Sequence, residues 1–161
     1  PRCRRSATGC SRRSIGTTRS EPVAVLSFGP THESGKTMKH AKDYLDEANA
    51  AVTRIEAGEA IARHGDANAQ FIDVRDSASI ADSGTIEGAL RIPRGMIEFV
   101  ADDESPMRNR ELRRDADLFL VCGAGGQAAL AGKTLKDMGY TSVTNIGGIG
   151  GWKEAGGKME D

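Results

Sequence analysis

Apolar side chains recur with a helical period from Met38 onward. Ala41, Leu45, Ala48 and Val52 follow one another at intervals of three or four residues, and Lys, Asp and Glu occupy many of the positions between them. Intervals of this kind place the apolar side chains on one face of a helix and the charged ones on the other. The pattern therefore predicts an amphipathic helix that packs against a core through one face.

Short apolar runs further along the chain predict strands. The predicted strands are 71–74, 118–121 and 142–146, and the predicted helices after the first are 59–64, one or two turns at 95–100, and 127–138. Residues 86–92, which lead into Pro93, are assigned no element. Residues 118–121 are apolar throughout, as in a central strand covered on both faces. Residues 76–84 form a polar stretch for which the pattern predicts no element. Strand, loop, helix and strand between 118 and 146 form a βαβ unit, which predicts an α/β fold with a mainly parallel sheet.

Composition narrows the class of protein. The 161 residues suit one compact domain, and 22 Lys and Arg against 23 Asp and Glu give a net charge of −1. A chain so nearly neutral has no general positive field for nucleic acid or an anionic membrane, and it contains no apolar run long enough to span a bilayer. Three cysteines cannot all pair, which argues against a disulfide scaffold. We therefore expect a cytoplasmic protein that binds neither nucleic acid nor membrane.

The first 37 residues differ from the rest. They hold seven basic and two acidic groups, whereas residues 38–161 hold 15 and 21. Segment 1–37 is rich in Ser, Arg, Thr and Gly, and its small apolar content cannot offset the entropy of ordering it. We expect it to be disordered or outside the natural protein, with the domain in 38–161. Gly29 to Thr37 resembles a phosphate-binding loop but has one residue too many between its glycines, so we do not expect nucleotide binding.

Cys122 is the main candidate for chemistry, because it follows the apolar strand and precedes a helix. The loop and first helical residues after it are Gly123, Ala124, Gly125, Gly126, Gln127 and Ala128. Small residues let successive backbone amides turn inward around the sulfur, and the positive end of the helix dipole adds to their effect. Both favour a thiolate, so Cys122 is a candidate nucleophile. The alternative is an ordinary small, buried residue behind a strand.

Several segments, in chain order, resemble the rhodanese-like sulfurtransferase domain over about residues 52–157. They are Asp73-Val74-Arg75, the stretch from Gly84 to Pro93, Cys122-x-x-Gly125 with the alanines that follow, Met138-Gly139-Tyr140, and Gly147-Gly148 with Trp152. The resemblance implies a three-layer α/β/α domain around a five-stranded, mainly parallel sheet, of the single-domain bacterial type. It also implies that Cys122 takes a sulfane sulfur from a donor such as thiosulfate, forms a persulfide, and passes the sulfur to an acceptor.

The implied partners are a small sulfur-containing anion or a protein persulfide as donor, and a thiol or cyanide as acceptor. No cofactor and no metal are implied, and we expect a monomer or weak dimer. His32, His40 and His64 show no metal-ligand spacing, and we expect His40 and His64 to be exposed. Trp152 is interpreted as a packing residue.

Departures from the family pattern concern the loop. Gln127 stands where the family often has Arg, and Ala128 where it often has Ser or Thr. Loss of a charge-assisted bond of roughly 1.5 to 3 kcal/mol weakens donor binding, so we expect reduced activity, or a catalytically weak binding or sulfur- and redox-sensing module. Arg94 is a candidate for the missing cation. Asp73 and Arg75 are more simply read as a structural pair than as catalysts.

Phosphatase and arsenate-reductase relatives of this family carry one more residue in the loop, in the pattern Cys-x5-Arg. The corresponding position here is Ala128. The loop therefore has the length found in sulfurtransferases, and we do not expect hydrolysis of phosphate esters.

Overall fold

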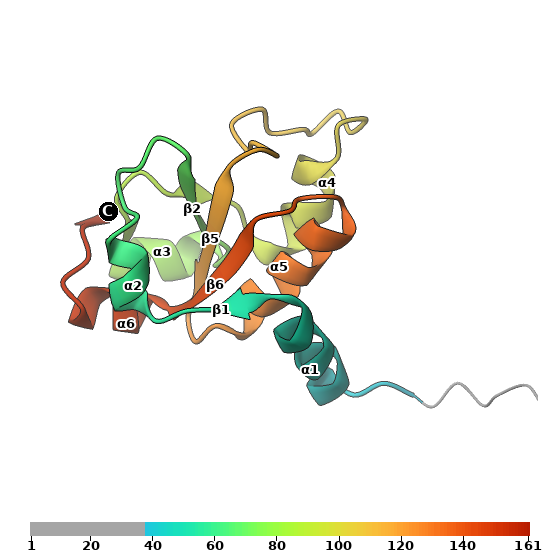
Figure 1. The fold of residues 1–161 in the computed structure, drawn as a ribbon, viewed down its shortest axis with the longest axis horizontal. Coiled ribbons are helices and arrows are strands. Elements are labelled where there is room, and N and C mark those ends of the chain that lie inside the picture. Colours follow the sequence, from blue (N-terminus) through green and yellow to red (C-terminus); the bar gives the residue numbers. More distant parts are fainter. Residues whose placement is uncertain (1–37) are drawn as a thin grey trace, which may run out of the picture. The chain divides into compact units, whose positions relative to one another are not determined.

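The computed structural model describes residues 38–161, so the expectations for 1–37 lie outside the described part. The helices are α1 (Ala41–Ala51), α2 (Ala57–Ile61), α3 (Ser77–Ser83), α4 (Ile97–Ala101) after a 3-10 turn (Arg94–Met96), α5 (Gly126–Asp137) and α6 (Ile149–Glu154). The strands are β1 (Thr53–Arg54), β2 (Ala69–Asp73), β3 (Thr85–Ile86), β4 (Leu90–Arg91), β5 (Asp117–Cys122), β6 (Val143–Gly148) and β7 (Met159–Glu160). Figure 1 shows this arrangement.

The main sheet has five parallel strands in the order β1-β6-β5-β2-β4, as expected for the fold class. β5 lies at its centre and pairs with β2 and β6. β3 and β7 form a separate antiparallel pair, which brings the C-terminal residues back to the middle of the chain. Within residues 38–161, no helix is long and apolar enough to cross a membrane.

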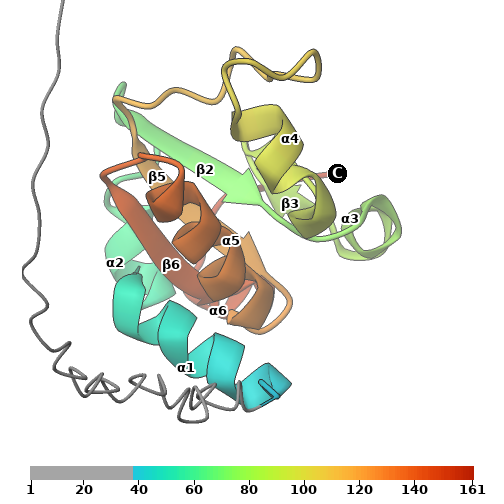
Figure 2. The same cartoon turned by 90° about the vertical axis from the view of Figure 1, so that its right-hand side faces the viewer.

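Two apolar clusters cover the two faces of the sheet. On one face, side chains of α4 and α5 pack on Ile72, Leu118 and Leu120; on the other, α2 and α6 pack on Phe71 and Phe119. Figure 2 shows α4 and α5 on the near side of the sheet, with α2 and α6 behind it. This alternation explains why 118–121 is apolar throughout, because successive side chains enter opposite cores.

The structure differs from the sequence-based expectations at several elements. α3 occupies part of the stretch read as polar; it was missed because Ile80 is its only buried residue, whereas Asp76 caps its first turn by accepting from the amide of Ser79 at 2.9 Å. β3 and β4 lie in the stretch before Pro93 to which the sequence pattern assigned no element, and Gly88, with φ of +71°, lies between them. β1, α6 and β7 were also not predicted.

His64 is half-buried rather than exposed. Its ring lies 5.3 Å from that of Phe71 and 5.5 Å from that of Trp152, and its Nε2 lies 2.9 Å from the carbonyl oxygen of Glu87. His40 is exposed as expected, and Trp152 is fully buried in a packing role. A histidine can turn an apolar ring face into a core while its nitrogen reaches a carbonyl, and the sequence spacing gave no sign of that.

Candidate active site

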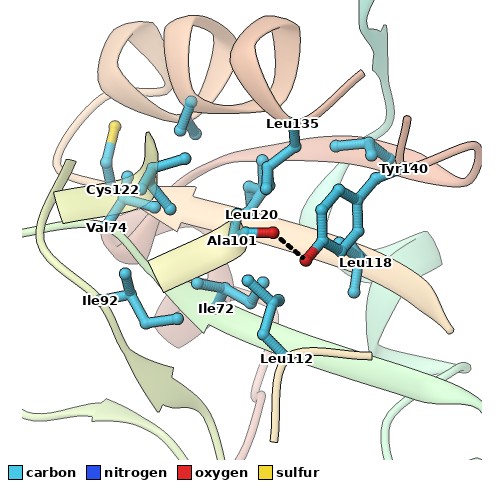
Figure 3. Close-up of a cluster of buried hydrophobic side chains, with 14 of the residues drawn as sticks. Ile72, Val74, Ile92, Ala101, Leu112, Leu118, Leu120, Cys122, Leu135 and Tyr140 are labelled. Carbon is cyan, nitrogen blue, oxygen red and sulfur yellow. Dashed lines mark hydrogen bonds between the residues drawn. The ribbon is translucent and has the colours of Figure 1, made fainter. Parts of the chain in front are cut away.

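Cys122 is the last residue of the central strand, and α5 begins four residues later. This is the edge of a parallel sheet where ligands bind, outside the carboxyl ends of the strands. The residue is 2% exposed and belongs to the apolar cluster on the α5 face. In Figure 3 its sulfur lies at the border of that cluster, beside Val74 and directed away from Leu118 and Leu120.

Gly125 shapes the loop that follows Cys122. Its φ is +94°, in the left-handed region that favours glycine, and it caps α5. Its amide donates to Sγ of Cys122 at 3.0 Å, and its carbonyl oxygen accepts from the amide of Ala129 at 3.0 Å. The sequence predicts several amides around the sulfur. Among residues 38–161, the hydrogen bond from the amide of Gly125 is the one recorded to Sγ. The sulfur therefore has one direct donor and lies beside the positive end of a helix of twelve residues.

The other predicted loop residues differ in exposure. Gly123, Ala124 and Gln127 are exposed, whereas Gly125 and Ala128 are buried. The loop after Cys122 thus exposes the side chain of Gln127 and otherwise carries only small residues.

Asn145 holds the loop from the neighbouring strand β6. It is 1% exposed; its Nδ2 donates to the carbonyl oxygen of Gly125 at 3.0 Å, and its Oδ1 accepts from the amide of Gly147 at 2.9 Å. Sequence reasoning missed this residue. The signal was available, because Asn145 is a polar residue inside an apolar strand that flanks the cysteine strand.

Gly148 packs directly against the loop backbone. A Cβ atom there would lie 2.6 Å from the carbonyl oxygen of Gly123, which is closer than any real contact allows. The adjacent Gly147 has φ of +85°. Gly148, of the Gly147-Gly148 pair noted in the sequence, therefore lets the backbone of the cysteine loop pack directly against β6.

Arg54, at the end of β1, is a second residue that sequence reasoning missed. Its side chain reaches the loop, because a Cβ on Gly125 would lie 3.0 Å from its Nη1 and a Cβ on Gly147 would lie 3.1 Å from its Nη2. Its strand joins the sheet beside β6, with Arg54 in register with Asn145. Nothing in the local sequence of this two-residue strand indicates that position.

Asp73 and Arg75 form a buried ion pair beyond the end of β2. Nη2 of Arg75 lies 2.6 Å from Oδ2 of Asp73, and the two side chains are 6% and 0% exposed. The hydroxyl of Thr85 donates to the same carboxylate oxygen at 2.8 Å, and Nη2 of Arg75 donates to the carbonyl oxygen of Gly84 at 2.6 Å. These contacts tie β2 to β3 and to the end of α3.

Arg94 directs its guanidinium away from the loop residues. Its Nη1 donates to Oε1 of Glu98 at 2.9 Å, and its Nη2 donates to Oγ1 of Thr134 at 3.1 Å. Thr134 lies two turns into α5, and Glu98 already supplies the opposite charge. The predicted role of Arg94 in anion binding stays a prediction to which these contacts add no support.

Metal-ligating side chains do not gather in the described part. Within residues 38–161, no group of three His, Cys, Asp or Glu side chains is arranged to hold a metal ion. The groups that the structure brings to the loop are the Cys122 sulfur, the amide of Gly125 and the guanidinium of Arg54.

Comparison with known proteins identifies similar chains. Residues 56–155 match the family model of the rhodanese-like domain. The uncharacterised protein YqhL of Bacillus subtilis is 33% identical over 98 residues, which are 61% of this chain and 69% of that protein. A sulfurtransferase of Allochromatium vinosum is 34% identical over 87 residues, covering 53% of this chain and 73% of that one.

A solved structure from Rhodopseudomonas palustris is also similar. It is described as a protein of unknown function and possible tyrosine phosphatase. It is 36% identical, with a TM-score of 0.73, and the match covers 76% of this chain and 96% of that chain.

Proposed function

The chain belongs to the rhodanese-like domain family, and from that premise we propose that it is a sulfurtransferase that carries sulfur as a persulfide on Cys122. The observation that supports this most is the amide of Gly125 at 3.0 Å from Sγ, at the carboxyl end of the central strand and beside the first turn of α5. A donor at this position stabilises negative charge on Sγ, which carries the charge in the thiolate before sulfur is taken up and after it is released. The similarity to the sulfurtransferase of Allochromatium vinosum also supports the proposal.

The proposed reaction has two steps. The Cys122 thiolate attacks the sulfane sulfur of thiosulfate; a bond forms between Sγ and that sulfur, the S–S bond of thiosulfate breaks, and sulfite leaves with the electron pair. A nucleophilic acceptor, cyanide or a thiolate, then attacks the outer sulfur. The bond to Sγ breaks, and its electron pair regenerates the thiolate. Charge balances in each step, and neither step needs a metal or an organic cofactor.

The roles proposed for the other loop residues follow from their positions. Gly123, Gly125 and Gly126, with Ala124 between them, keep the path to sulfur free of large side chains. Asn145 holds the carbonyl group of Gly125 through its Nδ2, while its Oδ1 accepts from the amide of Gly147 in its own strand. We further propose a cytoplasmic setting, with a small sulfur-containing anion or a protein persulfide as the donor.

Mass spectrometry of the Cys122 peptide tests this function. After incubation with thiosulfate or an organic persulfide, we expect the peptide to gain the mass of one sulfur atom and to lose it when cyanide is added. The Cys122→Ser variant should gain none, and the peptides that contain Cys3 and Cys10 act as internal comparisons. A folded protein whose Cys122 takes no sulfur from any donor would contradict the proposal.

A binding or sensing module is the second candidate, favoured by the 2% exposure of Cys122 and by Gln127 in the place of a loop arginine. Such a module would exchange sulfur slowly or not at all. It is distinguished by turnover: an enzyme forms thiocyanate repeatedly from thiosulfate and cyanide, whereas a sensing module stops after one sulfur per Cys122.

Phosphatase activity, suggested by the description of the relative from Rhodopseudomonas palustris, fits the loop poorly. The phosphatase relatives carry an arginine at the sixth position after the cysteine, and Ala128, which stands there in this chain, is fully buried. We expect no hydrolysis of an aryl phosphate ester under conditions in which sulfur uptake is measurable.

A further inference from the structure

The guanidinium of Arg54 lies against the backbone on the outer side of the cysteine loop. It contacts the positions of Gly125, whose amide donates to the sulfur, and Gly147, whose amide is held by Asn145. Arg54 is exposed, so its charged end is available to a solute that approaches the loop. A strand at the edge of the sheet thereby brings a positive charge to the loop that follows Cys122.

The charge of Arg54 is not neutralised within the described chain. Among residues 38–161 its guanidinium has neither an ion pair nor a hydrogen bond, whereas Arg94 is paired with Glu98 at 2.9 Å and Lys136 donates to the carbonyl oxygen of Ala51 at 2.8 Å. An arginine that keeps its planar set of donors free can bind an oxyanion through two parallel bonds.

The absence of side chains at two positions makes this placement possible. Gly125 and Gly147 both have positive φ, and a Cβ on either would lie within 3.1 Å of a guanidinium nitrogen of Arg54. Any larger residue at either position would press on the guanidinium. The two glycines therefore have two roles: they allow the positive φ angles of the backbone, and they leave space for the guanidinium of Arg54.

We propose that Arg54 is a specificity-determining residue that binds the anionic end of the sulfur donor, in place of the loop arginine that Gln127 lacks. This inference rests on the proposed function for its substrate, and it names the substrate class: small donors that carry a sulfonate-like oxyanion next to the transferable sulfur. Neutral donors gain nothing from Arg54.

The first test measures how Arg54 affects the approach of anions to Cys122, independently of sulfur transfer. The protein is treated with iodoacetate, which is an anion, and with iodoacetamide, which is neutral, and alkylation of the Cys122 peptide is followed by mass spectrometry. We expect Arg54→Ala to lower the ratio of the iodoacetate rate to the iodoacetamide rate by about three- to tenfold, mainly because the reaction with iodoacetate becomes slower. In 1 M KCl, where the Debye length is about 3 Å, wild type and variant should converge.

Two further variants serve as controls. Arg54→Lys keeps a charge without the planar fork and should retain part of the selectivity. Arg110→Ala removes another exposed arginine, in the loop before β5, and should leave the ratio unchanged. An equal ratio in wild type and Arg54→Ala would overturn the proposal. So would failure of both reagents to modify Cys122, since no solute would then reach the sulfur.

The second test uses sulfur donors. For thiosulfate, we expect Arg54→Ala to raise KM by about tenfold with a smaller change in kcat. For an alkyl persulfide, which carries no oxyanion and releases an alkyl thiolate when Cys122 takes its outer sulfur, we expect the variant to change KM and kcat little. An equal loss with both donors would indicate a merely structural role and would overturn the specificity claim. If wild-type protein takes sulfur from no donor but keeps its iodoacetate preference, the proposed function fails while the role of Arg54 as an anion-binding residue stands.

Discussion

Close backbone contact at Gly148 determines where the cysteine loop can lie. A methyl group at this position would meet a carbonyl oxygen of the loop at 2.6 Å, and that oxygen is backbone, so it cannot turn aside as a flexible side chain would. The required displacement falls on Gly123, the residue immediately after Cys122. Position 148 therefore couples β6 to the geometry of the sulfur.

We predict that Gly148→Ala lowers the free energy of unfolding by about 1 to 3 kcal/mol, because overpacking forces the backbone to shift. The matched control is Gly123→Ala, on the other side of the same contact, where a Cβ meets no heavy atom within 4 Å. Urea unfolding of both variants is the measurement. Equal free energies of unfolding in the two variants would contradict the prediction, because they would show that the loop backbone can shift at no cost.

Asp117 gives the stability a pH dependence at the start of β5. The hydroxyl of Ser142, at 2.6 Å, and then the guanidinium of Arg63, at 2.8 Å, hold the pKa of this carboxyl below its ordinary value of 3.8. The folded state therefore binds fewer protons here than the unfolded state does near pH 4. The resulting stabilisation is present above the unfolded pKa and is lost as the pH falls through the folded pKa.

We accordingly predict that Asp117→Asn flattens the decline of stability with acid below about pH 5. Ser142→Ala should flatten it partly, because it removes the larger cause and leaves Arg63 in place. Urea midpoints measured between neutral pH and about pH 3 would show both effects. A decline as steep as that of wild type in Asp117→Asn would assign the acid sensitivity to other carboxyls.

Among the elements, β2, α3 and β3 depend on one buried ion pair. Arg75 and Asp73 are almost fully enclosed, and Arg75 also donates to the carbonyl oxygen of Gly84, where α3 ends. Removal of one partner leaves a buried charge without its counterion, which costs far more than the pair itself contributes.

We predict that Arg75→Met destabilises the fold by about 3 to 5 kcal/mol. Arg91→Met is the control, because Arg91 is 44% exposed and its pair with Glu160 at 3.0 Å should contribute at most about 1 kcal/mol. Thermal or urea unfolding compares the two. A similar loss in both variants would contradict the distinction between enclosed and exposed pairs.

The elements also show how far the sequence could be read. The helix from Met38, the apolar strand at Cys122 and the helix after it carry strong periodicity, and the structure confirms them as α1, β5 and α5. α3 and α6 were missed because each buries only one or two side chains, so neither produces a period. The roles of the predicted site residues stay predictions.

Arg54 and Asn145 could not be placed beside Cys122 from local sequence, for a topological reason. Arg54 precedes the cysteine by 68 residues, and Asn145 follows it by 23. They meet at the loop because β1 pairs with β6 and β6 pairs with β5, an order that strand patterns alone do not specify. The apolar pattern identified the strand that ends at Cys122, but not which other strands lie beside it.

Over the domain of residues 38–161 as a whole, charge opposes the proposed substrate. Residues 38–161 hold 15 basic and 21 acidic groups, so the general field around the domain repels small anions. A local positive charge at the loop therefore matters more than it would on a basic protein. Added salt screens the general repulsion as well as the local attraction, which is why matched comparison of variants is needed at each salt concentration.

β1 is a two-residue strand at the rim of the sheet, whereas β5 is held on both sides. Rim segments open locally at a smaller free energy than central ones do. Cys122 and the proposed cation thus lie on strands that differ in the free energy of local opening. Brief fraying at the rim would carry the guanidinium away while the thiol stays in place, so discrimination between donors would fade on warming well before the protein melts.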